Sequence, residues 1–237
     1  MSSRALRRAN RATASEIADA IPSTTLHEGI TFSCKVSTGP RLSAVEREDV
    51  WQIFEDNMKG LYVNSVFGWD PPAKRDEMFH PLARYVLLHR PHSEHDDDSD
   101  GQDMNGRRSL VAYAGFRFED EEGENVLYCY ELQVSKSEQG HGLGKFLMQQ
   151  VFTIGRWWQM EKVMLTVLKA NTAARNFYES QGSPAFESHV KSFQESGEPG
   201  QSKTCGETAD SGGDAWEDEE DVVDCDYEIL SKAITSG

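Results

Sequence analysis

The chain has 237 residues, 38% of them apolar, which is enough for one globular domain with added segments. Its formal net charge of -16 argues against general nucleic-acid binding, because phosphates require a basic surface. No apolar stretch approaches the roughly 18 residues of a membrane-spanning helix. We therefore expect no direct DNA binding and no membrane association.

The ends and the cysteines add little chemistry. The arginine-rich start "MSSRALRRANRATASEIADAI" has no apolar signal core, so we predict a basic arm or helix within residues 1–40. The four cysteines lack CxxC spacing, which indicates free thiols and no metal site. Eleven acidic residues lie between Glu207 and Glu228 without a Lys or Arg, a pattern typical of solvated segments.

The first predicted elements are helices. Ser43 followed by Glu46 forms a capping-box pattern, and the apolar spacing after it predicts a helix over 43–60. "DPPAKRDEMFH" begins with prolines, as helix starts often do, and predicts a second, short helix. "ARYVLLHR" predicts a strand, and residues 91–108 have the composition of a polar insertion.

A hairpin and two β-α units follow. "SLVAYAGFRFE" and "NVLYCYELQV" predict strands joined by the turn "DEEGE". A long helix over 143–159 and a strand over 162–169 come next, then a helix opened by Asn171 and closed by Gly182. Strands at 183–189 and 226–234 flank a polar insertion at 190–223. This order predicts a three-layer α/β domain over 41–237, with a mixed sheet flanked by helices.

The glycine-rich stretch "QGHGLGK" precedes the long helix. Three residues separate Gly140 from Gly144 and Phe146 follows Lys145, which excludes the nucleotide P-loop; the glycine spacing also excludes the dinucleotide fingerprint. A helix beginning at Gly142 offers unpaired N–H groups and a positive dipole end to a pyrophosphate. An ordinary strand-to-helix turn is the alternative interpretation.

The stretch also fits the Q-x-x-G-x-G loop that binds acetyl-CoA in GNAT acetyltransferases, and "NTAARNFYESQG" is similar to a second motif of that superfamily. The resemblance implies the three-layer GNAT fold, with a mostly antiparallel sheet, and acetyl-CoA as cofactor. It also implies that Asn171 contacts the cofactor and that the Tyr178 hydroxyl lies near the leaving thiolate. The alternative for Tyr178 is a purely structural place in the helix core face.

Further stretches, among them "FGWDPPAKRDEM", "VLYCYELQV", "KVMLTV" and "YEIL", resemble the N-alpha-acetyltransferase D (NatD) family. That family acetylates histone N-termini beginning Ser-Gly-Arg-Gly. By this resemblance, the cofactor-binding residues are Leu132, Gln133, Val134, Gln139, Gly140, His141, Gly142, Leu143, Gly144, Lys145 and Asn171. The implied peptide-binding residues are Tyr62, Phe67, Glu119, Tyr130, Glu131, Thr166 and Tyr227. This chain has Glu119 where the family has Asp, and Phe67 where it has Trp.

The expected reaction does not require a strong base from the protein. A free α-amino group has a pKa of about 7.7–8.0, against about 10.4 for Lys, so a weak general base is enough. We predict Glu131 as that base, with Tyr130 and Tyr178 as further catalytic residues. The resemblance implies that the backbone N–H of Leu132 is the oxyanion donor. Strand alternation places Tyr128 and Tyr130 on one face and Cys129 with Glu131 on the other.

These residues lead to a function hypothesis. We expect an N-alpha-acetyltransferase for histone tails, in which Glu119 and Glu131 bind the arginine at the tail's third position. A GNAT enzyme acting on lysine side chains or another amine remains open, as does a histone-binding module. By the resemblance we expect a monomer in the cytoplasm and nucleus, and we leave ribosome association open.

Overall fold

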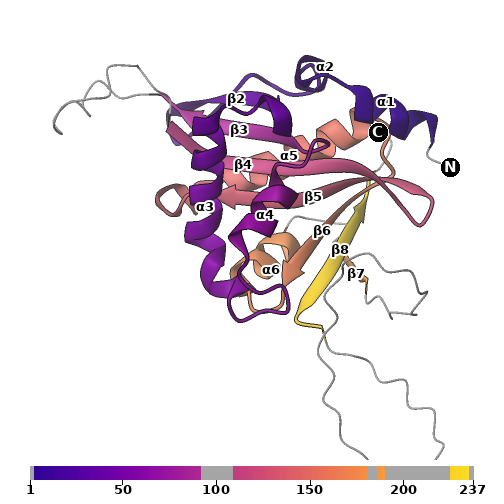
Figure 1. Cartoon of the computed structure of the whole chain (residues 1–237). Helices are drawn as coiled ribbons and strands as arrows, with labels where there is room; N and C mark the ends of the chain where they lie inside the picture. The colour runs from indigo at the N-terminus through magenta and orange to yellow at the C-terminus, as the bar shows by residue number, and fades with distance from the viewer. Residues whose placement is uncertain (1–2, 92–108, 181–185, 190–224, 235–237) are drawn as a thin grey trace, which may run out of the picture.

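A computed structural model describes residues 3–91, 109–180, 186–189 and 225–234. Nearly all of both predicted insertions, 91–108 and 190–223, lies outside these residues, as does Gly182. The described residues form a single eight-stranded sheet in the order β1-β2-β3-β4-β5-β6-β8-β7. Every neighbouring pair is antiparallel except β5 and β6, which are parallel. The predicted mixed sheet flanked by helices is confirmed (Figure 1).

The helices α3 (Ala44–Tyr62) and α4 (Pro71–Met78) cover one face of the sheet, as Figure 1 shows. Both begin as predicted. Ser43 and Glu46 form a reciprocal capping box at the start of α3, and the Asp70 side chain accepts a hydrogen bond from Ala73 at the start of α4. These caps fix the first turns of the two helices that border the pocket described below.

The centre of the sheet is the predicted hairpin of β4 (Ser109–Glu121) and β5 (Glu124–Val134). Its two-residue turn places Glu122 at φ 57° and Gly123 at φ 88°. Two positive φ angles in succession are typical of the tight turns that match strand twist. The remaining strands are β3 (Arg84–Arg90), β6 (Lys162–Leu168), β7 (Glu187–His189) and β8 (Tyr227–Ala233), all within stretches predicted as strands.

In the first 38 residues the predicted basic helix is present, but two strands were not predicted. These residues contain two short helices, α1 (Arg4–Arg11) and α2 (Ala14–Ala18), and the strands β1 (Thr24–His27) and β2 (Ile30–Thr38). The sequence does not predict these strands, because their half-buried Ser and Thr positions give weak hydrophobic alternation. Since β2 pairs with β3 over six residues, the domain boundary predicted at residue 40 falls inside one packed unit.

Two buried clusters lie on opposite faces of the sheet. The larger joins apolar residues of α1 and α2, such as Leu6 and Ile17, to α5 (Leu143–Trp157) and the central strands. The smaller joins α3 and α4 to β3 and β4 through Phe54, Tyr85 and Tyr113. Polar groups of β5 lie on the side of this smaller cluster, close to where the strands separate.

Candidate active site

The glycine loop has the backbone geometry that a bound phosphate requires. Gly142 is the N-cap of α5 and has φ 84°, and Gly140 has φ 86°, so both occupy the left-handed region that favours glycine. No side chain caps the first turn of α5, which leaves its N–H groups without a side-chain partner. Such a helix start fits the pyrophosphate of a nucleotide cofactor.

Neighbouring elements hold this loop in place. A Cβ added at Gly144 would make ordinary van der Waals contact with Phe177 at 3.5 Å and with Leu132 at 3.7 Å, so both side chains lie close to this glycine. The Gln139 side chain donates a hydrogen bond to the Val134 carbonyl at 3.1 Å. Lys145 is exposed. The loop is thus fixed between the end of β5 and the helix α6 (Thr172–Glu179).

The strands β5 and β6 separate next to this loop. Their pairing runs from Val126 to Cys129 on β5, and residues 130–134 have no partner on β6. A pocket of about 480 Å³ lies at this opening, between the strands and the segment that joins α3 to α4. Nine of the predicted site residues line it: Tyr62, Phe67, Tyr130, Glu131, Leu132, Gln133, Thr166, Asn171 and Tyr178.

A β-bulge changes which way β5 side chains point. Gly115 of β4 pairs with Glu131, but Phe116 pairs with Cys129, so Tyr130 is an extra residue in β5. Cys129 belongs to the larger buried cluster, whereas Glu131 contacts Lys74 of α4 on the opposite face. The predicted alternation, with Cys129 and Glu131 on one face, is therefore wrong, and the bulge brings Glu131 and the two tyrosines to the same pocket.

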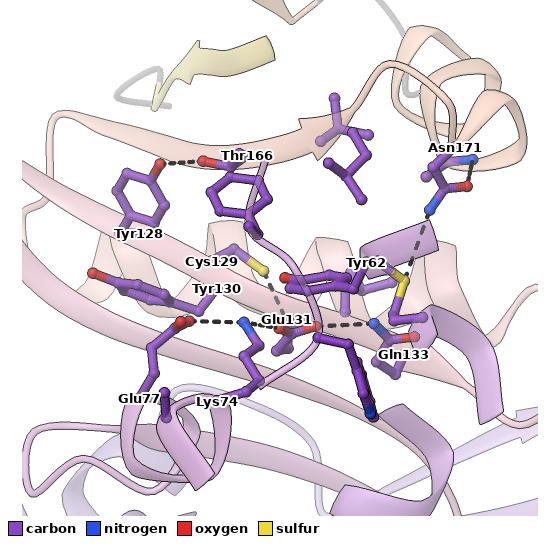
Figure 2. Close-up of a pocket in the computed structure, with 18 of the residues that line it drawn as sticks. Tyr62, Lys74, Glu77, Tyr128, Cys129, Tyr130, Glu131, Gln133, Thr166 and Asn171 are labelled. Carbon is purple, nitrogen blue, oxygen red and sulfur yellow. Dashed lines mark hydrogen bonds and ion pairs between the residues drawn. The ribbon is translucent and has the colours of Figure 1, made fainter. Parts of the chain in front are cut away.

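Glu131 is the buried carboxylate of this pocket, and only 6% of its side chain is exposed. Lys74 Nζ lies 2.8 Å from its Oε1, and Gln133 Nε2 donates to its Oε2 at 2.9 Å (Figure 2). Burial raises the pKa of Glu131, and the Lys74 ammonium and the Gln133 amide partly offset this rise. Burial acts to lower the pKa of Lys74, but Glu131, Tyr62 and Glu77 together outweigh it and raise the pKa. The two groups therefore form an ion pair.

The tyrosines make separate contacts. The Tyr130 hydroxyl donates to Glu119, whose oxygens lie 2.9 and 3.1 Å away, while the Tyr128 hydroxyl lies 2.6 Å from Thr166 Oγ1. Burial raises the pKa of Tyr62 and of Tyr128 to about 12, so both stay neutral at physiological pH. Neutral phenols around one carboxylate give the pocket aromatic walls with a few fixed polar groups.

The acetyltransferase (GNAT) family matches residues 52–182, more than half of the chain. The chain belongs to the GNAT family of acetyltransferases. It is a transferase that acetylates an amine, and acetyl-CoA is its cofactor. The site suits that cofactor in two ways. The uncapped start of α5 can bind its phosphates, and the opening between β5 and β6 can hold its extended chain.

Solved structures agree in fold. A GNAT acetyltransferase from Staphylococcus aureus Mu50 superposes with a TM-score of 0.52 at 13% identity, over 86% of this chain and 100% of that one. An acetyltransferase from Streptococcus agalactiae 2603 also gives 0.52, at 10% identity over 85% and 98% of the two chains. The NatC complex bound to Gag peptide and CoA gives a TM-score of only 0.44, at 14% identity over 68% and 90% of the two chains, which does not count as agreement in fold.

Within the GNAT fold, two predicted residues on α6 have clear positions. Asn171 is the N-cap, since its Oδ1 accepts from the Ala174 N–H at 3.1 Å, and its amide also contacts Met58 Sδ at 3.9 Å. The Tyr178 side chain is 8% exposed and reaches the pocket from the helix's buried face. Its hydroxyl has no hydrogen-bond partner in the described part of the chain, which leaves its proton available.

Other predicted residues lie outside the pocket lining. Glu119 stands behind Tyr130, so it does not share the pocket with Glu131 as expected. Tyr227 packs its ring 5.2 Å from that of Phe67 and supports the rim. The remainder form or flank the glycine loop: Val134, Gln139, Gly140, His141, Gly142, Leu143, Gly144 and Lys145.

Sequence reasoning missed several polar residues of this GNAT pocket. Lys74 and Glu77 of α4 line it, and Asn57 of α3 donates to Gln133 Oε1 at 3.0 Å. Gln133 was predicted to bind the cofactor, yet its side chain contacts Glu131 and Asn57. No local signal marks Lys74, because a lysine in a short charged helix reads as exposed.

Proposed function

We propose that this GNAT enzyme acetylates the free N-terminal amine of proteins, and that its substrates are histone tails beginning Ser-Gly-Arg-Gly. The observation that carries the proposal is the buried carboxylate of Glu131 in a pocket walled by Tyr62, Tyr128 and Tyr130. The resemblance of "LYCYELQV" and "YEIL" to the NatD family supports the choice of substrate.

The ion pair at Glu131 favours an α-amine over a lysine side chain. Lys74 lowers the basicity of Glu131 and repels an incoming ammonium group, so the substrate amine must arrive largely neutral. A free α-amine has a pKa of about 7.7–8.0, whereas a lysine amine near 10.4 is almost fully protonated at neutral pH. The pocket therefore suits an α-amine better than a lysine amine.

In this scheme, Glu131 and Tyr178 each carry out one proton transfer. Acetyl-CoA supplies the acetyl group as a thioester, and the amine nitrogen replaces its sulfur on the carbonyl carbon. Glu131 accepts the proton that the amine nitrogen loses, directly or through one water. Tyr178 donates its hydroxyl proton to the departing sulfur. Burial raises the pKa of Tyr178, so this hydroxyl remains protonated over the working pH range.

Acidic groups on the pocket wall support recognition of the tail. Glu77 and Glu121 both line the pocket, and Glu77 is 41% exposed on its side chain. A guanidinium at the tail's third position pairs well with such carboxylates. We propose these two residues, with Glu119 behind Tyr130, as the acidic surface that selects arginine. The crowded tyrosines favour glycine at the second position.

A peptide panel tests the assignment. Acetyl transfer is measured for Ser-Gly-Arg-Gly, its Arg-to-Ala variant, an N-terminally blocked copy that contains lysine, and unrelated N-termini. We expect the first peptide to react fastest and the blocked peptide not to react. Equal acetylation of the blocked peptide would establish the lysine alternative instead, and a flat response across the panel would remove the histone assignment.

A further inference from the structure

Lys74 is a buried cation that neither gives nor accepts a proton in the transfer steps proposed above. Its side chain is 9% exposed, and its ammonium lies 2.8 Å from both Glu131 Oε1 and Glu77 Oε1. The rings of Phe54 and Tyr62 cover it at 5.2 and 5.3 Å. Burying an ammonium is unfavourable unless it is paired. The pairing with Glu131 is thus a specific feature of this site.

The carboxylate of Glu131 is held by one residue of a helix and one residue of its own strand. Lys74 of α4 contacts one oxygen, and Gln133 of β5 donates to the other. Gln133 is itself fixed by Asn57 of α3, which donates to Gln133 Oε1 and to the Val134 carbonyl at 2.9 Å. Figure 2 shows Glu131 between Lys74 and Gln133 at the floor of the pocket. Each carboxylate oxygen keeps a lone pair for a further partner.

We propose that Lys74 is a positioning residue, which keeps the Glu131 carboxylate ionised and oriented so that it can accept the proton of the substrate amine. This proposal rests on the role of Glu131 as base, and not on the identity of the amine. Arginine or lysine at position 74 serves this purpose, whereas a neutral side chain of similar length does not.

The surrounding groups leave this task to Lys74. Glu77 of α4 raises the pKa of Glu131, as does burial, while Lys74 is the charged neighbour that lowers it. Tyr62 of α3, Tyr85 of β3 and Tyr113 of β4 all have pKa values raised by burial and by Glu131, so they remain neutral. Without Lys74, a negative Glu131 would face these neutral rings and a second carboxylate.

The test compares Lys74→Gln and Lys74→Arg with Lys59→Gln, a control at an exposed lysine paired with Glu55 at 3.0 Å. Kinetics are measured against pH with the best amine found for the wild type. We expect Lys74→Gln to move the acid limb of kcat/KM upward by about one pH unit and to lower kcat roughly tenfold, leaving KM for acetyl-CoA unchanged. Lys74→Arg should retain the wild-type limb, and Lys59→Gln should match the wild type throughout.

A direct titration separates positioning from a structural role. The carboxyl 13C signal of Glu131, assigned by its loss in Glu131→Gln, should titrate at higher pH in Lys74→Gln than in the wild type. A rate loss without this shift, or an unchanged acid limb, overturns the proposal. If Lys74→Gln does not fold, a wild-type Glu131 found protonated at pH 7 also overturns it. If the shift appears while Ser-Gly-Arg-Gly is not a substrate, only the histone assignment fails.

Discussion

The candidate active site has two halves, one proposed to bind the cofactor and one proposed to bind the amine, and they are built by different means. The cofactor half uses backbone: glycines with positive φ, and a helix start that no side chain caps. The amine half uses side chains, with a buried carboxylate on β5 paired to a lysine of α4. Backbone recognition needs a short contiguous motif, whereas the side-chain network draws on α3, α4, β5 and β6, which are far apart in the sequence.

This difference predicts distinct outcomes for substitutions. Changes in the amine half should lower kcat and alter its pH dependence, because they act on proton transfer. Changes in the cofactor half should raise KM for acetyl-CoA, because they act on binding. Four substitutions, taken from the largest expected effect to the smallest, test whether the two halves are separable in this way.

Glu131→Gln should have the largest effect. Loss of the general base is expected to lower kcat/KM about 100-fold or more. Because burial raises the pKa of Glu131, the wild-type rate should fall as the pH drops through a value above the ordinary 4.5, and the variant should lack this limb. Initial rates from pH 4.5 to 9 check both points. A similar loss of acetyl-CoA affinity, measured by calorimetry, would contradict the separation of the two halves.

Tyr178→Phe should lower kcat about tenfold, because it removes the hydroxyl proton that we propose goes to the leaving sulfur, a modest general-acid contribution. Its hydroxyl makes no hydrogen bond within the described residues, so stability should change little. Steady-state kinetics and thermal unfolding measure the two quantities. Phe186→Leu, which removes a ring 5.7 Å from that of Tyr178, is the matched control. An unchanged kcat in Tyr178→Phe would assign this residue to packing alone.

Gly142→Ala should affect binding more than chemistry. A left-handed backbone costs about 1–2 kcal/mol for a residue with a Cβ, and the new methyl would lie 3.4 Å from His27. We expect KM for acetyl-CoA to rise roughly tenfold with little change in kcat. Gly60→Ala is the control, since a Cβ there meets nothing within 4 Å. A selective fall in kcat would show that the loop also shapes the amine half.

Ser43→Ala should have the smallest effect on catalysis. It removes the capping box of α3, the helix that carries Asn57 and Tyr62, and should lower the free energy of unfolding by about 1 kcal/mol. Burial raises the pKa of Glu46, but hydrogen bonds from Lys35 and Ser43 outweigh this and lower it. That stabilisation is present above pH 4.5 and is lost as the pH falls through the lowered value. Urea unfolding at pH 7 and pH 3 should therefore differ less for the variant than for the wild type.

The sequence predicted the fold and the backbone of the glycine loop well, because their signals are local. The glycine spacing, the caps at Ser43 and Asn171, and the "DEEGE" turn each specify backbone within a few residues. The amine half was predicted only in part, through the resemblance. A bulge at Tyr130 and a buried partner at Lys74 depend on contacts between distant segments, which periodicity does not encode.

The hairpin of β1 and β2 has a practical consequence for work with shortened forms of this protein. Deleting the first 40 residues would remove β2 and leave β3 as an edge strand, with Val86, Leu87 and Leu88 fully buried in the intact protein. An apolar edge with unpaired backbone groups is a template for aggregation. A truncated enzyme of this kind should precipitate even though its glycine loop and pocket residues are all retained.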